Sequence, residues 1–198
     1  MPAHTKTELI LGGQKSGKSR RAELLAREWL AAAPDHRAAL IATAEPHDNE
    51  MRERIARHRR DRAARVPGLA TLEVPHDVAT ALARASDPRT LVVVDCLTLW
   101  LTHWTMPLGV EVMDLEQKAA MVLEWQAQLA MFLVAIEQAP GPVVLVGNEI
   151  GLGVIPMGRE VRAFVDALGV LNQRVAAVCP RVTLMAAGLP LTLKEPRP

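Results

Sequence analysis

The chain has 198 residues, of which 49% are hydrophobic, so it is long enough to bury the core of one domain. It carries 23 Lys and Arg against 22 Asp and Glu, a formal net charge of +1, and only 3% aromatic residues with no tyrosine. This composition offers neither a strongly basic surface nor many side chains that stack on bases, so we expect no nucleic-acid partner.

The cysteines and the apolar runs indicate a reduced protein outside the membrane. Cys96 and Cys179 lie far apart without zinc-type spacing, and no secretory leader precedes the first predicted strand. The longest apolar stretches, such as 91–102, are interrupted well before the roughly 20 residues that a membrane span needs. We expect a cytoplasmic protein without a membrane span, with residues 1–198 forming a single P-loop nucleotide-binding transferase domain.

Short apolar strands alternate with longer helical patterns along the chain. The predicted strands are 8–11, 38–43, 71–74, 91–94, 143–147 and 182–187. The predicted helices are about 17–33, 48–64, 77–85, 112–138 and 159–178. Continuous apolar strands are typical of a parallel sheet that is buried on both faces, so the order predicts a doubly wound α/β fold.

The sequence GGQKSGKS at 12–19 matches the phosphate-binding pattern G-x-x-x-x-G-K-[ST] between a predicted strand and a predicted helix. Its backbone N–H groups can surround phosphate oxygens, Lys18 can reach the β- and γ-phosphates, and Ser19 can ligate Mg²⁺. The positive end of the helix dipole adds to the attraction. We therefore expect a nucleotide to contact Gly12, Gly13, Gln14, Lys15, Ser16, Gly17, Lys18 and Ser19.

An acid follows the fourth predicted strand. Asp95 comes directly after the run LVVV, where a P-loop enzyme places a carboxylate that supports magnesium. A solvated acid at a strand end is the alternative interpretation. A switch GTPase is disfavoured, because DALG at 166–169 lies within a helical pattern and GNEIG at 147–151 lacks the lysine of the guanine motif.

An arginine-rich helix with one histidine is predicted at 48–65, with Asp48 as its N-cap. Helical spacing puts four residues on one face, which predicts that His58 lies away from open solvent: Met51, Ile55, His58 and Arg62. Arginines can neutralise a triphosphate, and an unprotonated imidazole can attack phosphorus to form a phosphoramidate. The alternative is a solvated basic helix with an incidental histidine.

The other histidines have weaker claims to a chemical role. His47 near the helix start is a minor rival, and His4 and His36 fall in a tail and a turn. His76 and His103 are expected to flank loops without a comparable charged setting.

Six segments stand in order from residue 11 to about residue 194: LGGQKSGKSRRAE, IATAEPHDNEMRERIARHRRDR, VVVDCLTLWLT, VGNEIGLGVIP, GVLNQRVA and AGLPLTLK. Together they resemble the bifunctional adenosylcobinamide kinase/adenosylcobinamide-phosphate guanylyltransferase family of cobalamin biosynthesis. The resemblance implies a RecA-like P-loop fold and a homo-oligomer, of trimeric form in that family.

The resemblance also implies a two-step reaction. Adenosylcobinamide is phosphorylated on its aminopropanol hydroxyl with ATP or GTP. GMP from GTP is then transferred to adenosylcobinamide phosphate through a guanylylated histidine, giving adenosylcobinamide-GDP. The matching histidine is His58, and Lys18 is the second residue expected to be catalytic.

By the same resemblance, nucleotide contacts beyond the phosphate loop are expected at Thr43, Ala44, Glu45, Arg59, Arg60, Asp61, Arg62, Glu73 and Asp95. A carboxylate such as that of Glu73 could accept hydrogen bonds from the guanine edge. The bland alternatives are that Thr43 only ends its strand, that Glu73 faces water and that the arginines are a solvated run. Ser19 and Asp95 are the candidate Mg²⁺ ligands.

The chain departs from the family pattern at positions that are commonly basic. Val165 and Val170 stand there, and the lost charge could weaken a phosphate or corrinoid contact or be replaced by Arg159, Arg162 or Arg174. Leu69 occupies a place where tryptophan is common. The loop 147–156 follows a predicted strand, where open α/β sheets bind ligands.

Two other functions stay open from the residues alone. A plain small-molecule P-loop kinase would use His58 structurally and form no covalent GMP adduct. A regulatory nucleotide-binding module would bind GTP or ATP without corrinoid-stimulated turnover.

Overall fold

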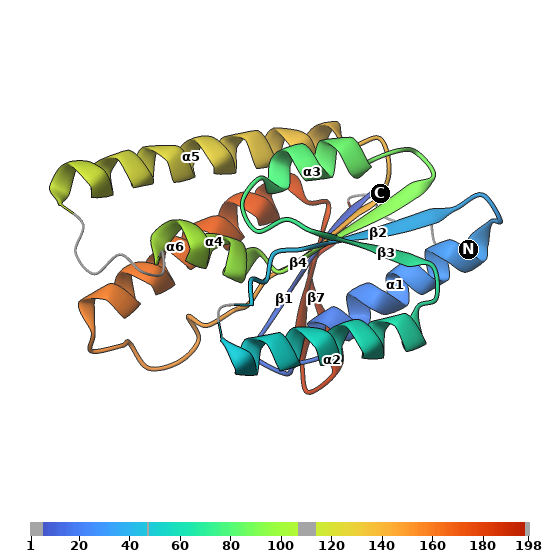
Figure 1. Cartoon of the computed structure of the whole chain (residues 1–198), viewed down its shortest axis with the longest axis horizontal. Helices are drawn as coiled ribbons and strands as arrows, with labels where there is room; N and C mark the ends of the chain where they lie inside the picture. The colour runs from blue at the N-terminus through green and yellow to red at the C-terminus, as the bar shows by residue number, and fades with distance from the viewer. Residues whose placement is uncertain (1–5, 47, 107–113, 197–198) are drawn as a thin grey trace.

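The computed structural model describes residues 6–46, 48–106 and 114–196, which form one seven-stranded sheet covered by helices (Figure 1). The elements in chain order are β1 (Thr7–Gly12), α1 (Lys18–Ala32), β2 (Arg37–Ala42), α2 (Asn49–Arg65), β3 (Leu69–Glu73), α3 (Val78–Ala85), β4 (Thr90–Asp95), α4 (Leu97–Thr105), α5 (Leu115–Gln138), β5 (Val143–Val146), α6 (Arg159–Val178), β6 (Arg181–Ala186) and β7 (Leu189–Lys194).

The strand order in the sheet is β3-β2-β4-β5-β1-β6-β7. The first six of these strands are parallel, and only β7 pairs antiparallel, with β6. In register, Ala42 lies beside Asp95, and Asp95 lies beside Val146. The carboxyl ends of β2, β4 and β5 therefore meet at one edge of the sheet, the edge at which such folds bind ligands.

Two apolar layers cover the two faces of the sheet. Leu9 and Leu11 pack into the layer formed with α3, α4, α5 and α6, whereas Ile10 between them packs into the layer formed with α1. Figure 1 shows α1 and α2 on the side of the sheet opposite α3 and α5. This alternation explains why the inner strands read as continuous apolar runs, and it confirms the predicted doubly wound α/β architecture.

The structure differs from the predicted elements at one strand, and it contains two elements that were not predicted. The predicted strand 71–74 corresponds to β3, which lies at the sheet edge and is mostly exposed rather than buried on both faces. The helix α4 and the strand β7 were not predicted. The segment of α4 continues the apolar run of β4 directly, so hydrophobicity alone does not mark where the strand ends.

The helix α5 contains one stretch, Glu116–Gln138, that is long and apolar enough to cross a membrane by length and composition. Core helices of globular proteins pass the same test. Here Leu129, Phe132 and Ile136 are buried in the layer that covers the sheet, so part of this apolarity serves the core.

Candidate active site

The phosphate loop connects β1 to α1 with a backbone that requires glycine at two points. Gly12 has φ 153° and Gly17 has φ 101°, both in the region that L side chains rarely adopt. A Cβ atom at Gly12 would lie 2.5 Å from the Met185 carbonyl oxygen and 2.6 Å from Ser16 Oγ. Gly12 is therefore required by close packing as well as by conformation, and Gly17 is required by conformation.

The buried Lys18 side chain folds back over the loop. Its Nζ donates a 2.6 Å hydrogen bond to the Gly13 carbonyl oxygen, and burial lowers the pKa of the amine while Cys96 and Asp95 oppose this effect. Ser16 Oγ is buried and has no hydrogen-bond partner among the described residues. A buried hydroxyl without a partner suits a ligand oxygen, as expected of a phosphate cradle. Gly13, Gln14 and Lys15 are exposed.

Asp95 lies at the end of β4 and connects the phosphate loop to α2. Its carboxylate is hydrogen-bonded to Ser19, and it interacts electrostatically with Arg62 and Lys18. Burial raises the pKa of Asp95, while Ser19, Arg62 and Lys18 act in the opposite direction. Four of the predicted site residues therefore converge here: Lys18, Ser19, Arg62 and Asp95.

Thr43 follows β2 and is completely buried. Its N–H donates to the Asp95 carbonyl oxygen at 3.2 Å, and its hydroxyl donates to the Cys96 carbonyl oxygen at 2.8 Å and accepts from the Cys96 N–H at 2.9 Å. These bonds join the ends of β2 and β4. Ala44 and Glu45 are half-buried beside this junction.

Two histidines lie against Glu45, contrary to the expectation that they lack a charged setting. His76 Nε2 is 3.6 Å from Glu45 Oε1, and His103 Nδ1 is 3.5 Å from Glu45 Oε2. His103 belongs to α4 and its Nε2 lies 2.8 Å from the Thr43 carbonyl oxygen. No local pattern in the sequence indicates this cluster, because Glu45, His76 and His103 lie 27 or more positions apart and meet only through the fold.

The start and end of α2 are well defined. The Asp48 carboxylate accepts a 2.6 Å hydrogen bond from the Met51 N–H, which confirms the predicted N-cap. Near the other end, Arg65 donates to both carboxylate oxygens of the buried Glu23 on α1, at 2.7 and 3.2 Å. This bidentate pair fixes α2 to the helix that follows the phosphate loop.

The prediction that His58 avoids open solvent is wrong, because its side chain is exposed. Met51, Ile55 and Arg62 of the same predicted face are half-buried. The face of α2 that is covered by the rest of the protein is therefore narrower than the spacing predicts, and His58 does not belong to it. Arg60 and Asp61 are also exposed.

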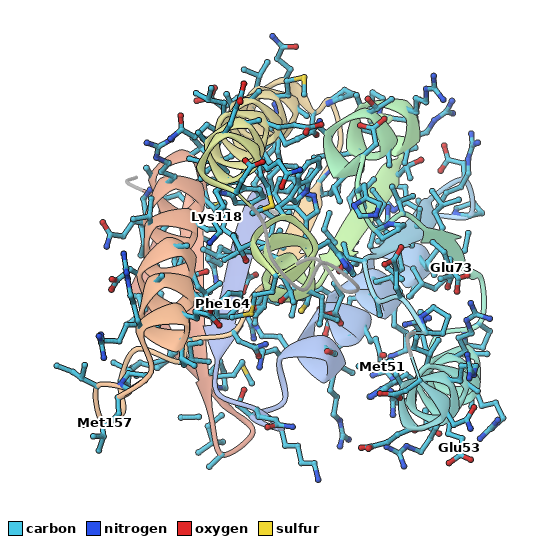
Figure 2. All side chains as sticks on the ribbon, turned by 60° about the vertical axis from the view of Figure 1, so that its left-hand side comes forward. Met51, Glu53, Glu73, Lys118, Met157 and Phe164 are labelled. Carbon is cyan, nitrogen blue, oxygen red and sulfur yellow. The ribbon has the colours of Figure 1, made fainter. Side chains whose placement is uncertain are left out.

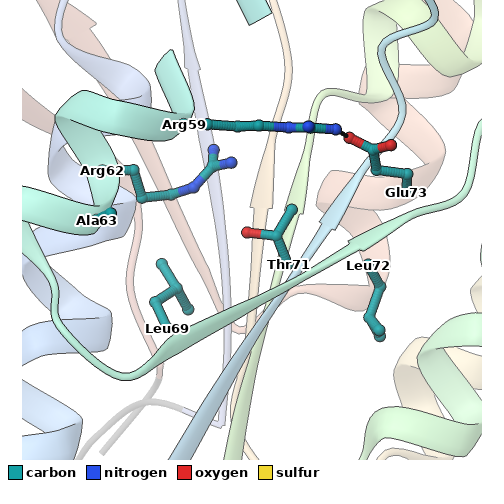
Figure 3. A pocket seen from close by; sticks show the side chains of 7 residues that line it. All are labelled: Arg59, Arg62, Ala63, Leu69, Thr71, Leu72 and Glu73. Atoms are coloured by element: carbon teal, nitrogen blue, oxygen red, sulfur yellow. Dashed lines mark ion pairs between the residues drawn. The ribbon is translucent and has the colours of Figure 1, made fainter. Parts of the chain in front are cut away.

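A cavity of about 640 Å³ lies between α2 and the edge strand β3 (Figure 3). Arg59 reaches across it and forms an ion pair with Glu73, while Arg62 points into it from the next turn. Burial lowers the pKa of Arg62, and Glu23 and Asp95 oppose this effect. The cavity is lined by Arg59, Arg62, Ala63, Leu69, Thr71, Leu72 and Glu73.

The loop after β5 packs against the start of the phosphate loop. The Glu149 N–H donates to the Gly12 carbonyl oxygen at 3.0 Å, and Asn172 Nδ2 donates to the Asn148 carbonyl oxygen at 3.0 Å. Thr98 Oγ1 accepts from the Asn148 N–H at 2.8 Å. Asn172 and Thr98 are buried supports that sequence analysis did not assign, although Asn172 belongs to the quoted segment GVLNQRVA.

The same loop ends in exposed apolar side chains. Leu152, Val154, Ile155 and Met157 are 81%, 96%, 77% and 94% exposed, and Figure 2 shows Met157 at the outer end of the loop. Arg162 holds this turn by donating to the carbonyl oxygens of Pro156 and Met157 at 2.9 and 2.6 Å.

The two valines at commonly basic positions lie on α6, Val165 half-buried and Val170 48% exposed. Of the arginines considered as replacements, Arg162 is engaged by the loop carbonyls.

Comparison with solved structures supports the fold. The flagellar accessory protein FlaH from Methanocaldococcus jannaschii aligns with a TM-score of 0.52 over 98% of this chain and 80% of its own, at 12% identity. A likeness at this identity concerns the fold alone, and it confirms the predicted RecA-like P-loop class.

Comparison with known sequences identifies the family. A family model described as cobinamide kinase/cobinamide phosphate guanyltransferase matches residues 8–193. The bifunctional adenosylcobalamin biosynthesis protein CobP of Pseudomonas aeruginosa is 42% identical over 94% of this chain and 96% of its own length. The corresponding CobU of Salmonella typhimurium is 35% identical over 94% and 98%. These matches confirm the expected resemblance and its enzyme class: the chain belongs to the cobinamide kinase/cobinamide phosphate guanyltransferase family.

Proposed function

We propose that this chain phosphorylates adenosylcobinamide with ATP or GTP and then transfers GMP from GTP to adenosylcobinamide phosphate through His58. The observation that carries the proposal is the convergence of Lys18, Ser19 and Asp95 beside Arg62, a residue of the helix that bears His58. A triphosphate held by the loop would thus lie next to that helix. The family match supports the same two activities.

In the kinase step the substrate hydroxyl oxygen attacks the γ-phosphorus, and the bond from that phosphorus to the β–γ bridging oxygen breaks. Lys18 and the N–H groups of the loop neutralise the charge of the transferred group, which is the main catalytic requirement of phosphoryl transfer. The hydroxyl proton is lost to solvent or to a nearby base, and the nucleoside diphosphate leaves.

In the transferase step a nitrogen of His58 attacks the α-phosphorus of GTP and pyrophosphate leaves. An oxygen of adenosylcobinamide phosphate then attacks the same phosphorus, the P–N bond breaks and free His58 is regenerated. The exposure of His58 favours this step, because a bulky second substrate needs access to the phosphoramidate. Arg59, Arg60 and Arg62 supply positive charge, with Asp61 beside them on the helix.

We propose that the guanine occupies the cavity between α2 and β3. Glu73 can accept hydrogen bonds from the guanine N–H groups, and the apolar side chain of Leu69 can cover the ring. Glu73 is paired with Arg59, so a guanine would compete with this ion pair and release the Arg59 guanidinium toward phosphate. Thr43, Ala44 and Glu45 are proposed as further contacts at the adjacent strand end.

The residues at the phosphate loop fit Mg²⁺. Ser19 Oγ and the Asp95 carboxylate are hydrogen-bonded to one another at the loop, and hard oxygen donors are what Mg²⁺ prefers. When bound, the ion would neutralise charge on the β- and γ-phosphates.

We further propose that residues 1–198 act as one domain in a cytoplasmic homo-oligomer, a trimer by family resemblance. Two free cysteines support a reducing location. The exposed apolar loop that contains Leu152 and Ile155 supports a subunit contact. Light scattering tests the trimer, and an observed monomer contradicts it.

Incubating the protein with adenosylcobinamide, ATP, GTP and Mg²⁺, with chromatography of the corrinoids over time, tests the activity. The proposal predicts the phosphate form first and the GDP form later. A reaction that stops at the phosphate supports a plain kinase, and unchanged adenosylcobinamide supports a nucleotide-binding module instead.

A further inference from the structure

His103 is a buried histidine of α4 that the proposed reaction does not use. Its side chain is only 8% exposed, yet α4 begins directly after the Asp95–Cys96 pair at the ligand edge of the sheet. A buried imidazole needs hydrogen-bond partners, and the partners of His103 indicate its role at this edge of the sheet.

Both ring nitrogens of His103 face the segment that follows β2. The carbonyl oxygen of Thr43 can only accept, so the Nε2 atom, 2.8 Å away, carries a hydrogen and donates it. On the other side of the ring, Nδ1 faces Glu45 Oε2 at 3.5 Å, and the two groups form an ion pair when both ring nitrogens carry hydrogen. One side chain therefore contacts the first and the last residue of the segment Thr43, Ala44, Glu45.

The two ends of this segment differ in how firmly the rest of the protein holds them. Thr43 is completely buried and bonded to Asp95 and Cys96 through its N–H and its hydroxyl. The Glu45 side chain is 31% exposed, and His76 approaches its other oxygen at 3.6 Å. His103 thus connects a fixed anchor to a carboxylate that can reach a ligand.

We propose that His103 is a positioning residue for the nucleotide, which holds the Glu45 carboxylate in place at the end of β2 by bracing it against the fixed carbonyl of Thr43. This inference rests on the proposed function in one respect, namely that Glu45 contacts GTP. His103 itself touches neither the nucleotide nor the corrinoid. Its loss therefore affects affinity for GTP through Glu45 rather than the transfer step.

Two substitutions separate the contacts of the ring. His103→Leu removes both polar contacts at similar volume, whereas His103→Gln places an amide N–H near the position of Nε2 and can still donate to Thr43. We expect His103→Leu to raise the Kd and KM for GTP about ten-fold with kcat changed less than about three-fold. His103→Gln is expected to fall between this variant and the wild type.

His36 offers a matched control. Its Nδ1 also lies 2.8 Å from a backbone carbonyl oxygen, that of Trp29, and its ring stacks on the Trp29 indole, but it precedes β2 at the opposite edge of the sheet. His36→Leu is expected to lower thermal stability while leaving the Kd for GTP unchanged. A purely structural role for His103 would make the two leucine variants behave alike.

Action through Glu45 is tested by the combination with Glu45→Gln. The inference predicts that His103→Leu adds no further loss of GTP affinity to the Glu45→Gln protein. Multiplying effects, or a wild-type Kd in His103→Leu, would overturn it. If His103→Leu does not fold, as circular dichroism would show, the same comparison with His103→Gln decides the question.

Measuring GTP binding by calorimetry distinguishes a failure of the proposed function from a failure of the proposed role of His103. A wild type that binds GTP without transferring GMP contradicts the proposed function, while the Kd values of the variants still test the role of His103. A wild type that transfers GMP, with His103 variants of unchanged affinity, contradicts this inference alone.

Discussion

The hydroxyl of Ser19 is hydrogen-bonded to the carboxylate of the half-buried Asp95, which joins the first turn of α1 to the end of β4. Burial raises the pKa of Asp95 although Ser19, Arg62 and Lys18 favour its ionised form. Ionisation of Asp95 therefore lowers the free energy of unfolding, and the carboxylate lies where it could support a magnesium–nucleotide complex.

The pKa of Asp95 predicts opposite effects of Asp95→Asn on stability and activity. Because folding raises this pKa, the folded state binds the proton more tightly, and the free energy of unfolding falls as pH rises through the folded-state pKa. Near pH 8 we expect Asp95→Asn to unfold with an unchanged free energy or one up to about 1–2 kcal/mol higher. Both transfer activities should nevertheless fall. Urea titrations at pH 5 and pH 8 measure the effect, and a clear destabilisation at pH 8 contradicts it.

Lys18 is expected to serve both reaction steps. Its amine lies over the loop on the Gly13 carbonyl oxygen, from which it can move to phosphate oxygens. Lys18→Ala should lower the rates of phosphorylation and GMP transfer by about 100-fold or more, with the fold retained. Lys118→Ala, on the exposed side of α5, is the control and should match the wild type. Loss of only one activity would show that the two steps use separate phosphate sites.

An ion pair between the buried Glu8 of β1 and Arg21 of α1 predicts a large effect on stability without a role in the reaction. Glu8 is 5% exposed, and one of its carboxylate oxygens accepts from Arg21 at 2.9 Å and from the Thr183 hydroxyl at 2.7 Å. Glu8→Ala leaves both donors without this partner, so we expect a loss of about 2–3 kcal/mol in chemical denaturation. Arg89→Ala, which breaks an exposed ion pair, should cost much less.

The two cysteines are expected to be unreactive in the folded protein. Burial raises the pKa of Cys96 to about 11, with Asp95 adding to the shift, and burial raises the pKa of Cys179 to about 12. At pH 8 the thiolate fractions are then on the order of 10⁻³ and 10⁻⁴. Alkylation followed by mass spectrometry should be at least about 100-fold slower in native than in denatured protein. Rapid labelling of native Cys96 would contradict the raised pKa of its thiol.

The sequence predicts the fold well where the signals are local. The glycines of the phosphate loop, the Asp48 cap and the helix 159–178 follow from residue type and spacing, and the structure has α6 at Arg159–Val178. β7 is missed because its exposed residues, starting at Leu189, lack the apolar run used to find the other strands. Ala187 and Gly188 form the turn before it with positive φ values, and the glycine between two apolar segments is the sequence signal that could have revealed the hairpin.

The candidate site is predictable only in part. The convergence of Ser19 and Asp95 follows from parallel strands that end at one edge. The exposure of His58 does not follow from periodicity, because a spacing pattern defines a helix face but not how deeply the sheet edge covers that face. The contacts of His103 with Thr43 and Glu45 depend on the order β3-β2-β4, which no local pattern encodes.

The intact mass of the purified protein after incubation with Mg²⁺ and GTP tests the central claim most directly. The account predicts a GMP adduct on the wild type, stable to alkali and labile to acid, and no adduct on His58→Ala. The His58→Ala protein should still bind GTP and phosphorylate adenosylcobinamide, because the phosphate loop is intact. A folded, GTP-binding wild type without an adduct, or an adduct that persists on His58→Ala, would contradict the role of His58.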